Sequence, residues 1–199
     1  MRDNKRPSQH PRQDGRKPFQ GKREDSQRKP EVEAIVLDYY QDVSQKGDRA
    51  TYIAFLLGCK KFSLLKGTSF KPLNLKPGDL IKIRANLATS TRINFKDLPT
   101  SLQDNLGSFI EIIVAHDEAR FVAFFNNARP ITTRLHSLQL VPGIGNKRMW
   151  SLLKSRKAKP FENFDDLKER GGISDPVDML AKRILQEIHG EEKYKLFCK

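Results

Sequence analysis

The stretch at residues 135–153 reads Leu135-His136-Ser137-Leu138-Gln139-Leu140-Val141-Pro142-Gly143-Ile144-Gly145-Asn146-Lys147-Arg148-Met149-Trp150-Ser151-Leu152-Leu153. Apolar residues recur at helical spacing on both sides of its Pro-Gly-Ile-Gly turn. The pattern therefore predicts two short helical segments joined by a tight hairpin, and this unit decides how we interpret the rest of the chain.

Each residue of the turn has a physical role in that prediction. Gly143 and Gly145 carry no Cβ, so the backbone can turn sharply and approach another backbone closely. Ile144, between them, is expected to anchor the turn in the core. Gly145 immediately precedes a helix, whose first N–H groups have no partner within the helix. These free amides, with Lys147 and Arg148 in the first turn, predict a site for an anion such as phosphate.

The same residues resemble the helix-hairpin-helix motif. The resemblance implies contact with the phosphates of nucleic acid through the turn and the helix that follows. A basic run continues along that helix, since residues 146–159 hold six Lys or Arg and no acidic residue. A hairpin that only packs helices or binds protein is the alternative for the turn, and a solvated helix face is the alternative for the basic run. The candidate nucleic-acid-binding residues are Gly143, Ile144, Gly145, Asn146, Lys147, Arg148, Lys154, Arg156 and Lys157.

The only tryptophan of the chain, Trp150, lies in this helix. Residues at the equivalent place of such hairpins often pack inside, so we expect Trp150 in the core rather than as a stacking platform. Met149 stands where the motif usually has a small alanine, which predicts looser helix packing.

A second, degenerate copy of the hairpin is predicted at residues 160–184. Its turn reads Gly172-Ile173-Ser174-Asp175, with aspartate in place of the second glycine. The carboxylate would repel phosphate, so we expect this copy mainly to support the first. Lys182 and Arg183 remain candidates for contact with the nucleic-acid backbone.

Upstream, residues 31–96 are predicted to form a small β-barrel of the OB type. Strand-like runs and turn signals alternate there, and Pro77-Gly78 suits a type II turn. The strands are expected near residues 32–40, 51–57, 61–65 and 80–84, with a fifth near Ile93 and Phe95, and a polar loop at residues 66–72. The aromatic residues Tyr39, Tyr52, Phe55 and Phe62 are each as suited to the core as to stacking on bases.

Residues 97–128 are predicted to be a helical connector. Leu98, Leu102, Leu106, Phe109, Ile110, Ile113 and Val114 fit one helix face, and Phe121, Val122, Phe124 and Phe125 a second helix. Asp97-Leu98-Pro99 is expected to cap the first helix, with proline in its first turn. The predicted class is therefore α+β: an OB-like barrel at 31–96, a connector at 97–128 and an all-α tandem helix-hairpin-helix domain at 129–199.

The net charge of +13 lies at the two ends of the chain. Residues 1–30 carry +6, residues 31–128 carry +1 and residues 129–199 carry +6. Such charge favours a polyanionic partner. The first 30 residues lack an apolar pattern and are expected to be a disordered basic arm, either touching phosphates or only solubilising the protein.

Several function classes are disfavoured by composition. No stretch approaches the length of a membrane span, and the N-terminus does not read as a secretory signal. Cys59 and Cys198 form no disulfide framework, which favours a reducing, cytoplasmic location. The four histidines are scattered, so we expect no metal site and no cofactor.

In its order of motifs the chain resembles the archaeal domain-of-unknown-function family 655 over residues 31–199. The resemblance rests on residues 129–138 and 142–150, then on Lys159-Pro160-Phe161, Asp166-Leu167-Lys168-Glu169-Arg170 and Tyr194-Lys195-Leu196-Phe197. It implies an OB-like barrel joined to helix-hairpin-helix modules and a role in binding nucleic acid or nucleotides. The placement of such genes beside ribosomal and RNA polymerase genes favours RNA. The implied partners are ribosomal RNA, other structured RNA or duplex DNA, with ribosomal or transcription proteins as further partners.

We expect a binding protein rather than an enzyme. A helix-hairpin-helix DNA glycosylase is the enzymatic alternative, with Pro176-Val177-Asp178 as a partial match to its catalytic run. Asp178 lies 33 residues after Gly145, further than such enzymes place their aspartate, and it falls within the second hairpin. A protein-interaction adaptor in a ribonucleoprotein is the other alternative.

Overall fold

The computed structural model describes residues 30–43, 50–190 and 192–198. The chain from Glu31 onward forms one compact unit. The predicted basic arm lies outside the described residues. The boundaries predicted at 96 and 128 therefore separate parts of one unit, whose main core runs from Ile35 to Cys198.

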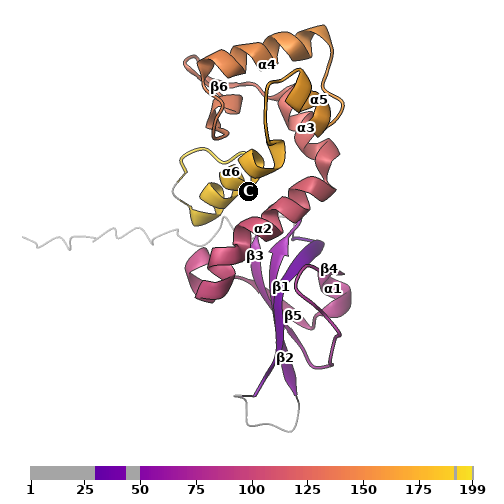
Figure 1. The fold of residues 1–199 in the computed structure, drawn as a ribbon. Coiled ribbons are helices and arrows are strands. Elements are labelled where there is room, and N and C mark those ends of the chain that lie inside the picture. Colours follow the sequence, from indigo (N-terminus) through magenta and orange to yellow (C-terminus); the bar gives the residue numbers. More distant parts are fainter. Residues whose placement is uncertain (1–29, 44–49, 191, 199) are drawn as a thin grey trace, which may run out of the picture. The chain divides into compact units, whose positions relative to one another are not determined.

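The first half of this unit is a five-stranded antiparallel sheet (Figure 1). Its strands are β1 (Glu33–Asp42), β2 (Thr51–Gly58), β3 (Leu64–Ser69), β4 (Leu80–Lys82) and β5 (Thr89–Arg92). They lie in the order β4-β1-β2-β3-β5. Among the described residues the two edge strands do not pair with each other, so the sheet is open and the predicted closed barrel is not formed. Both edge strands are short, and β4 gives way at once to the helix α1 (Ile83–Asn86).

Three strand predictions are corrected by the structure. β3 runs to Ser69, through the segment predicted as a polar loop, because residues 65–69 pair with β2 although Lys66 and Thr68 are polar. Ile83 and Arg84 lie in α1 instead of extending the fourth strand. The fifth strand is the polar, fully exposed Thr89–Arg92, and Phe95 starts the 3-10 helix η2 (Phe95–Asp97).

The turn before β4 has the predicted geometry. Gly78 adopts φ +95°, and the N–H of Asp79 donates to the carbonyl of Lys76 at 3.0 Å, as a type II turn requires.

Both faces of the sheet are covered by apolar side chains. Ile35, Leu37 and Phe55 point into the main core, which includes the helix α2 (Thr100–His116). The opposite face forms a smaller core of Ala34, Val36, Ala54, Leu56, Leu65, Ile81 and Ile83.

Helix α2 and helix α3 (Glu118–Asn127) form the predicted connector. Leu106, Ile110 and Ile113 are buried as the pattern predicts. The predicted cap is different, because Pro99 precedes the helix and Asp97 instead accepts a hydrogen bond from the N–H of Asn94 at 2.8 Å within η2. Helix α2 lies against both β1 and the last helix, α6 (Pro176–His189). No described helix is long and apolar enough to cross a bilayer.

The remaining elements form the predicted helical region. They are the two-stranded ribbon of β6 (Pro130–Thr132) and β7 (Leu135–His136), the 3-10 helix η3 (Ser137–Leu140), α4 (Asn146–Ala158), α5 (Phe164–Glu169) and α6. The first helical segment of the predicted hairpin is therefore the single 3-10 turn η3, preceded by the two-residue strand β7. This segment is shorter than the helix that the apolar pattern predicts.

The C-terminal segment is held by one buried carboxylate. Glu187 of α6 is fully buried and accepts hydrogen bonds from the N–H groups of Leu196, Phe197 and Cys198 at 2.7 to 2.9 Å. Arg183 donates to the same side chain at 2.9 Å. These bonds satisfy the buried charge and fix Phe197 in the core.

Candidate functional site

The turn between η3 and α4 has the tight geometry that its glycines predict. Gly143 adopts φ +82°, a conformation that favours glycine. The N–H of Ile144 donates to the carbonyl of Val141 at 3.1 Å, and the Ile144 side chain is buried. Ile144 can therefore offer a ligand only its backbone.

Gly145 plays a different part from Gly143. It is the N-cap of α4 with φ −82°, and a Cβ added there would meet no atom within 4 Å. The fold does not require glycine at this position. The missing side chain leaves the start of α4 open to solvent and to a ligand.

Four consecutive backbone amides lie at this opening. The N–H groups of residues 145–148 have no acceptor among the described residues, and the first helical bond runs from Met149 to the carbonyl of Gly145 at 2.9 Å. The amides of a helix start carry the positive end of its dipole. The opening of α4 can therefore hold an anion.

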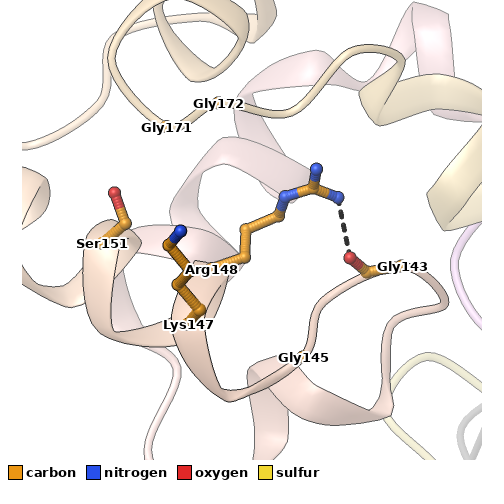
Figure 2. A pocket seen from close by; sticks show the side chains of 7 residues that line it. All are labelled: Gly143, Gly145, Lys147, Arg148, Ser151, Gly171 and Gly172. Carbon is orange, nitrogen blue, oxygen red and sulfur yellow. Dashed lines mark hydrogen bonds between the residues drawn. The ribbon is translucent and has the colours of Figure 1, made fainter.

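A groove of about 480 Å³ lies at this opening (Figure 2). Its lining residues come from both predicted hairpins: Gly143, Gly145, Lys147, Arg148 and Ser151 from the first, and Gly171 and Gly172 from the second. The glycines keep much of its wall free of side chains. The second hairpin thus forms one wall of the groove.

Two basic side chains line the groove in different ways. Arg148 folds back and donates to the carbonyl of Gly143 at 2.7 Å, which stiffens the turn (Figure 2). Lys147 is exposed and has no ion-pair partner in the described part of the chain. Lys147 therefore offers a free ammonium, whereas Arg148 combines charge with a structural bond.

A chain of hydrogen bonds supports the turn from the side of η3. The Asn146 carboxamide accepts from Gln139 at 2.6 Å, and Gln139 accepts from the N–H of His136 at 2.7 Å. His136 in turn accepts from the N–H of Leu138 through Nδ1 at 3.2 Å. Burial, with a smaller effect of the Arg156 charge, lowers the pKa of His136. The neutral imidazole that results is the form able to accept this bond.

The basic run of α4 divides into exposed and inward-facing residues. Lys154 and Lys157 are exposed and have no ion-pair partner among the residues described. Arg156 instead donates to the carbonyls of Phe125 and Ala128 at 2.7 and 2.8 Å, at the end of α3. The guanidinium of Arg156 thus fastens α4 to α3, and its predicted role in binding stays a prediction.

Acidic residues are absent from the sequence around α4, and among the cations described there only Arg120 and Lys159 pair with the flanking carboxylates of Asp117 and Glu162. Residues 119–161 contain nine Lys or Arg and no Asp or Glu. Such a segment produces an unbalanced positive field, which attracts polyanions.

Trp150 is exposed, with 66% of its surface accessible. The prediction that it packs in the core is wrong. Met149 is buried instead and occupies the inward face of α4. Both residues are apolar and adjacent, and the sequence alone did not distinguish which of them faces inward.

The second hairpin repeats the turn but closes its helix start. Gly172 adopts φ +68° and Ile173 is fully buried, like Gly143 and Ile144. One extra residue, Ser174, precedes the N-cap Asp175, whose carboxylate accepts from the N–H of Asp178 at 3.0 Å. Pro176 occupies the first turn and has no N–H to offer. The start of α6 is therefore capped by its own chain.

The basic residues of α6 are also engaged. Lys182 pairs with Asp178 at 2.7 Å, and Arg183 is 2% exposed and pairs with Glu187 and Glu192. The expectation that Arg183 touches nucleic acid is wrong, because its side chain is buried. Asp178, the residue of the glycosylase alternative, is a partner of Lys182 in the first turn of α6.

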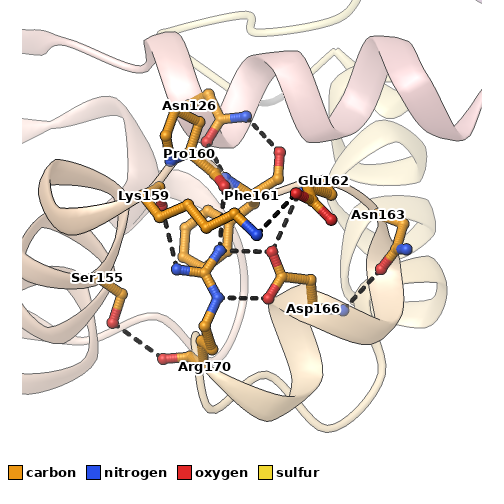
Figure 3. Close-up of polar contacts among 9 residues, drawn as sticks. All are labelled: Asn126, Ser155, Lys159, Pro160, Phe161, Glu162, Asn163, Asp166 and Arg170. Carbon is orange, nitrogen blue, oxygen red and sulfur yellow. Dashed lines mark hydrogen bonds and ion pairs between the residues drawn. The ribbon is translucent and has the colours of Figure 1, made fainter.

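Arg170 joins the two hairpins (Figure 3). Its guanidinium donates to the Asp166 carboxylate and to the carbonyls of Lys159 and Pro160 at 3.0 Å, and it lies over the Phe161 ring. The hydrogen bonds from Arg170 lower the pKa of Asp166 to about 2. The segment between α4 and α5 is therefore clamped, and the two walls of the groove are connected through it.

The candidate aromatics of the sheet separate into two groups. Phe55 and Phe62 belong to the core. Tyr39 and Tyr52 stack on each other with centroids 5.7 Å apart, and the Tyr39 hydroxyl accepts from the N–H of Leu73 at 2.7 Å. Two exposed aromatic residues were missed at the sequence level, Tyr40 and Phe70.

Comparison with known proteins places the chain among uncharacterised archaeal proteins. It is 43% identical over 109 residues to "Uncharacterized protein MJ0038" of Methanocaldococcus jannaschii, a match covering 54% of this chain and 50% of that relative. The matched part thus spans half the length of that curated relative. The crystal structure of Af1531 from Archaeoglobus fulgidus is 34% identical, with a TM-score of 0.74, and covers 85% of this chain and 100% of that one. A family model described as "Protein of unknown function (DUF655)" matches residues 30–199. The chain therefore belongs to this family, as its motifs indicated.

Proposed function

We propose that this protein binds nucleic acid through the sugar-phosphate backbone, with little dependence on sequence, at the groove of the first hairpin. The observation that carries the proposal is the set of four unbonded amides at residues 145–148, beside the free ammonium of Lys147. A phosphate at a helix start accepts such amides and is stabilised by the helix dipole. We favour RNA over duplex DNA, in keeping with the sequence resemblance.

We infer that the two turn–helix units form a tandem helix-hairpin-helix pair. Support comes from the repeated positive-φ glycine followed by a buried isoleucine, at Gly143-Ile144 and at Gly172-Ile173. In this interpretation the first unit binds phosphate and the second supports it. We interpret the five-stranded sheet as an opened relative of the OB barrel, a fold that binds nucleic acid on its sheet face.

The test is the salt dependence of binding. Phosphate contacts release counterions, so log K should fall linearly with log salt concentration. Replacing Lys147 and Arg148 with alanine should lower the slope by roughly 1 to 2 units on a structured RNA or a DNA duplex. The matched control replaces Lys168 and Lys182, whose ammonium groups already pair with Asp165 and Asp178. An unchanged slope in the first variant would count against this site.

A role as a protein-interaction adaptor is the second candidate. It is favoured by large apolar side chains left exposed near the sheet, including Val32, Phe70 and Leu80. Their partners would be ribosomal or transcription proteins. Co-purification with and without nuclease separates the two candidates, because an adaptor keeps its partners after the nucleic acid is digested.

A further inference from the structure

Trp150 is the most exposed aromatic side chain described, yet it lies on a well-ordered helix beside the groove. Within residues 30–43, 50–190 and 192–198 its ring makes no contact with another aromatic ring or with a cation. Packing of α4 does not need it, because Met149 and Leu152 fill the inward face. The indole is therefore free to meet a ligand.

Three lysines share the face of α4 that carries Trp150. Lys147 precedes Trp150 by three residues, and Lys154 and Lys157 follow it by four and seven, which places all four side chains on one face at about 100° per residue. All three lysines are exposed, and none has an ion-pair partner in the described ranges. We call these four residues the tryptophan–lysine stripe. Lys147 also lines the groove, so the stripe begins where the groove ends.

We propose that the stripe binds an unpaired stretch of the nucleic acid, with one base stacked on Trp150 and the flanking phosphates on the lysines. This inference rests on the proposed function, and it names the substrate class as single-stranded or looped nucleic acid. Aromatic side chains stack on bases of any kind, while lysines follow the backbone. Bases within a duplex have both faces covered, so an exposed indole can engage only a base that is unpaired or turned outward.

The length of the stripe suits this ligand. Residues 147–157 rise by about 15 Å along the helix. A stacked strand advances about 3.4 Å per nucleotide, so the stripe spans about four nucleotides. A protein partner fits less well, because closing an apolar surface over the indole would also desolvate three unpaired ammonium groups.

The test uses the intrinsic fluorescence of the full chain, since Trp150 is its only tryptophan. Three probes of about 12 nucleotides are compared at low salt: an oligouridylate, an abasic strand with the same number of phosphates, and a blunt duplex. Affinity is measured by the anisotropy of a label on the probe, and stacking by quenching of the tryptophan emission. Trp150→Ala and Trp150→Phe are compared with Ile112→Ala, which truncates an exposed apolar side chain on another helix, α2.

Stacking predicts that the oligouridylate binds and quenches, whereas the abasic strand and the duplex bind without quenching. Trp150→Ala should lower the affinity for the oligouridylate by roughly 5- to 100-fold and leave the affinity for the abasic strand unchanged. Trp150→Phe should restore most of the affinity, and Ile112→Ala should have no effect on it.

Two results overturn the proposal in distinguishable ways. Equal binding of all three probes without quenching, unaltered in Trp150→Ala, removes the stacking role and leaves phosphate binding intact. If no probe binds at low salt, the proposed function is wrong as well. If the protein then co-purifies with a protein partner, and Trp150→Ala abolishes that co-purification, the indole belongs to a protein interface.

Discussion

The two hairpins of this protein share a turn and differ in what surrounds it. Both place a glycine at positive φ before a buried isoleucine. The first leaves its helix amides open behind Gly145, while the second closes them with the carboxylate of Asp175. Backbone geometry is thus repeated, and a single N-cap side chain decides whether a helix start is open to an anion.

The cations of the two hairpins differ in the same way. Every Lys and Arg of residues 164–190 has an acidic partner: Lys168, Arg170, Lys182 and Arg183 pair with Asp165, Asp166, Asp178 and Glu187 respectively. In α4 the exposed lysines have no ion pair among the described residues. The cations of the second hairpin are engaged in ion pairs, whereas the exposed lysines of the first remain available. The following predictions test this division, beginning with the largest effect.

Removing the buried cation of the second hairpin should have the largest effect. Arg183→Ala leaves Glu187 buried without its charged partner, which should lower the free energy of unfolding by about 3–5 kcal/mol. Urea denaturation measures the loss. Lys154→Ala in the first hairpin should change stability by less than about 0.5 kcal/mol. If Arg183→Ala unfolds the protein, Arg183→Lys should recover a folded state, since it keeps a positive charge beside the buried Glu187.

The next largest effect should be a difference in stability between alanine substitutions at two glycines of the groove, Gly171 and Gly145. A Cβ at Gly171 would come within 2.5 Å of the Leu167 carbonyl and 2.9 Å of the Leu152 side chain, so Gly171→Ala should cost roughly 1–3 kcal/mol. A Cβ at Gly145 meets nothing within 4 Å, so Gly145→Ala should keep the melting temperature unchanged. The same Gly145→Ala should weaken nucleic-acid binding if phosphate approaches the amides closely. Equal destabilisation by Gly171→Ala and Gly145→Ala would contradict the conclusion that only Gly171 lacks space for a side chain.

Exposed lysines should affect binding and not folding. Replacing Lys154 and Lys157 with alanine should lower the salt slope of binding by about 2 units without moving the unfolding midpoint. Replacing the paired Lys168 and Lys182 should leave the slope as it was. A similar slope change in both pairs would mean that ion pairing does not distinguish the two hairpins.

The smallest effect concerns pH, because the two hairpins are capped by different groups. His136 caps η3 by accepting from Leu138, and Asn163 caps α5 by accepting from Asp166 at 2.8 Å. Burial lowers the pKa of His136 in the folded protein. In the unfolded chain the pKa of His136 is about 6.5, so the unfolded state takes up a proton first as the pH falls. The contribution of His136 to the free energy of unfolding should therefore be fully present above the pKa of the unfolded state. It should decline as the pH falls from there to the lower pKa of the folded state.

The measurement compares unfolding midpoints at neutral and mildly acidic pH in the wild type and in His136→Asn. The variant keeps an acceptor that does not titrate, so the part of the pH dependence due to His136 should vanish. An identical decline in both proteins would assign the effect to other groups.

The sequence predicts best where one residue type meets one geometric demand. Gly143 was predicted in a tight turn and Gly78 at the third position of a type II turn, and both adopt the positive φ that such turns need. The N-cap role of Asp175 was not predicted, although aspartate is a common N-cap residue. The apolar spacing of α2 also identified its buried face. These signals are local and need no tertiary context.

What the sequence did not predict depends on tertiary partners. β5 has no apolar alternation, since it is an exposed edge held by its pairing with β3. Arg156 and Lys157 are adjacent cations, and only the position of α3 decides that Arg156 turns inward. Trp150 was expected in the core but is exposed, because the rotation of α4 against its neighbours turns the adjacent Met149 inward instead.

The empty space around Gly145 has a consequence for genetics. Aspartate at this position would cap the amides of α4 from within, as Asp175 does for α6, and its carboxylate would occupy the place of an external anion. Cells bearing Gly145→Asp would contain a normally folded protein at normal abundance with its anion site filled. Comparing such cells with a deletion strain would show which phenotypes come from blocking the proposed phosphate site and which from losing the protein altogether.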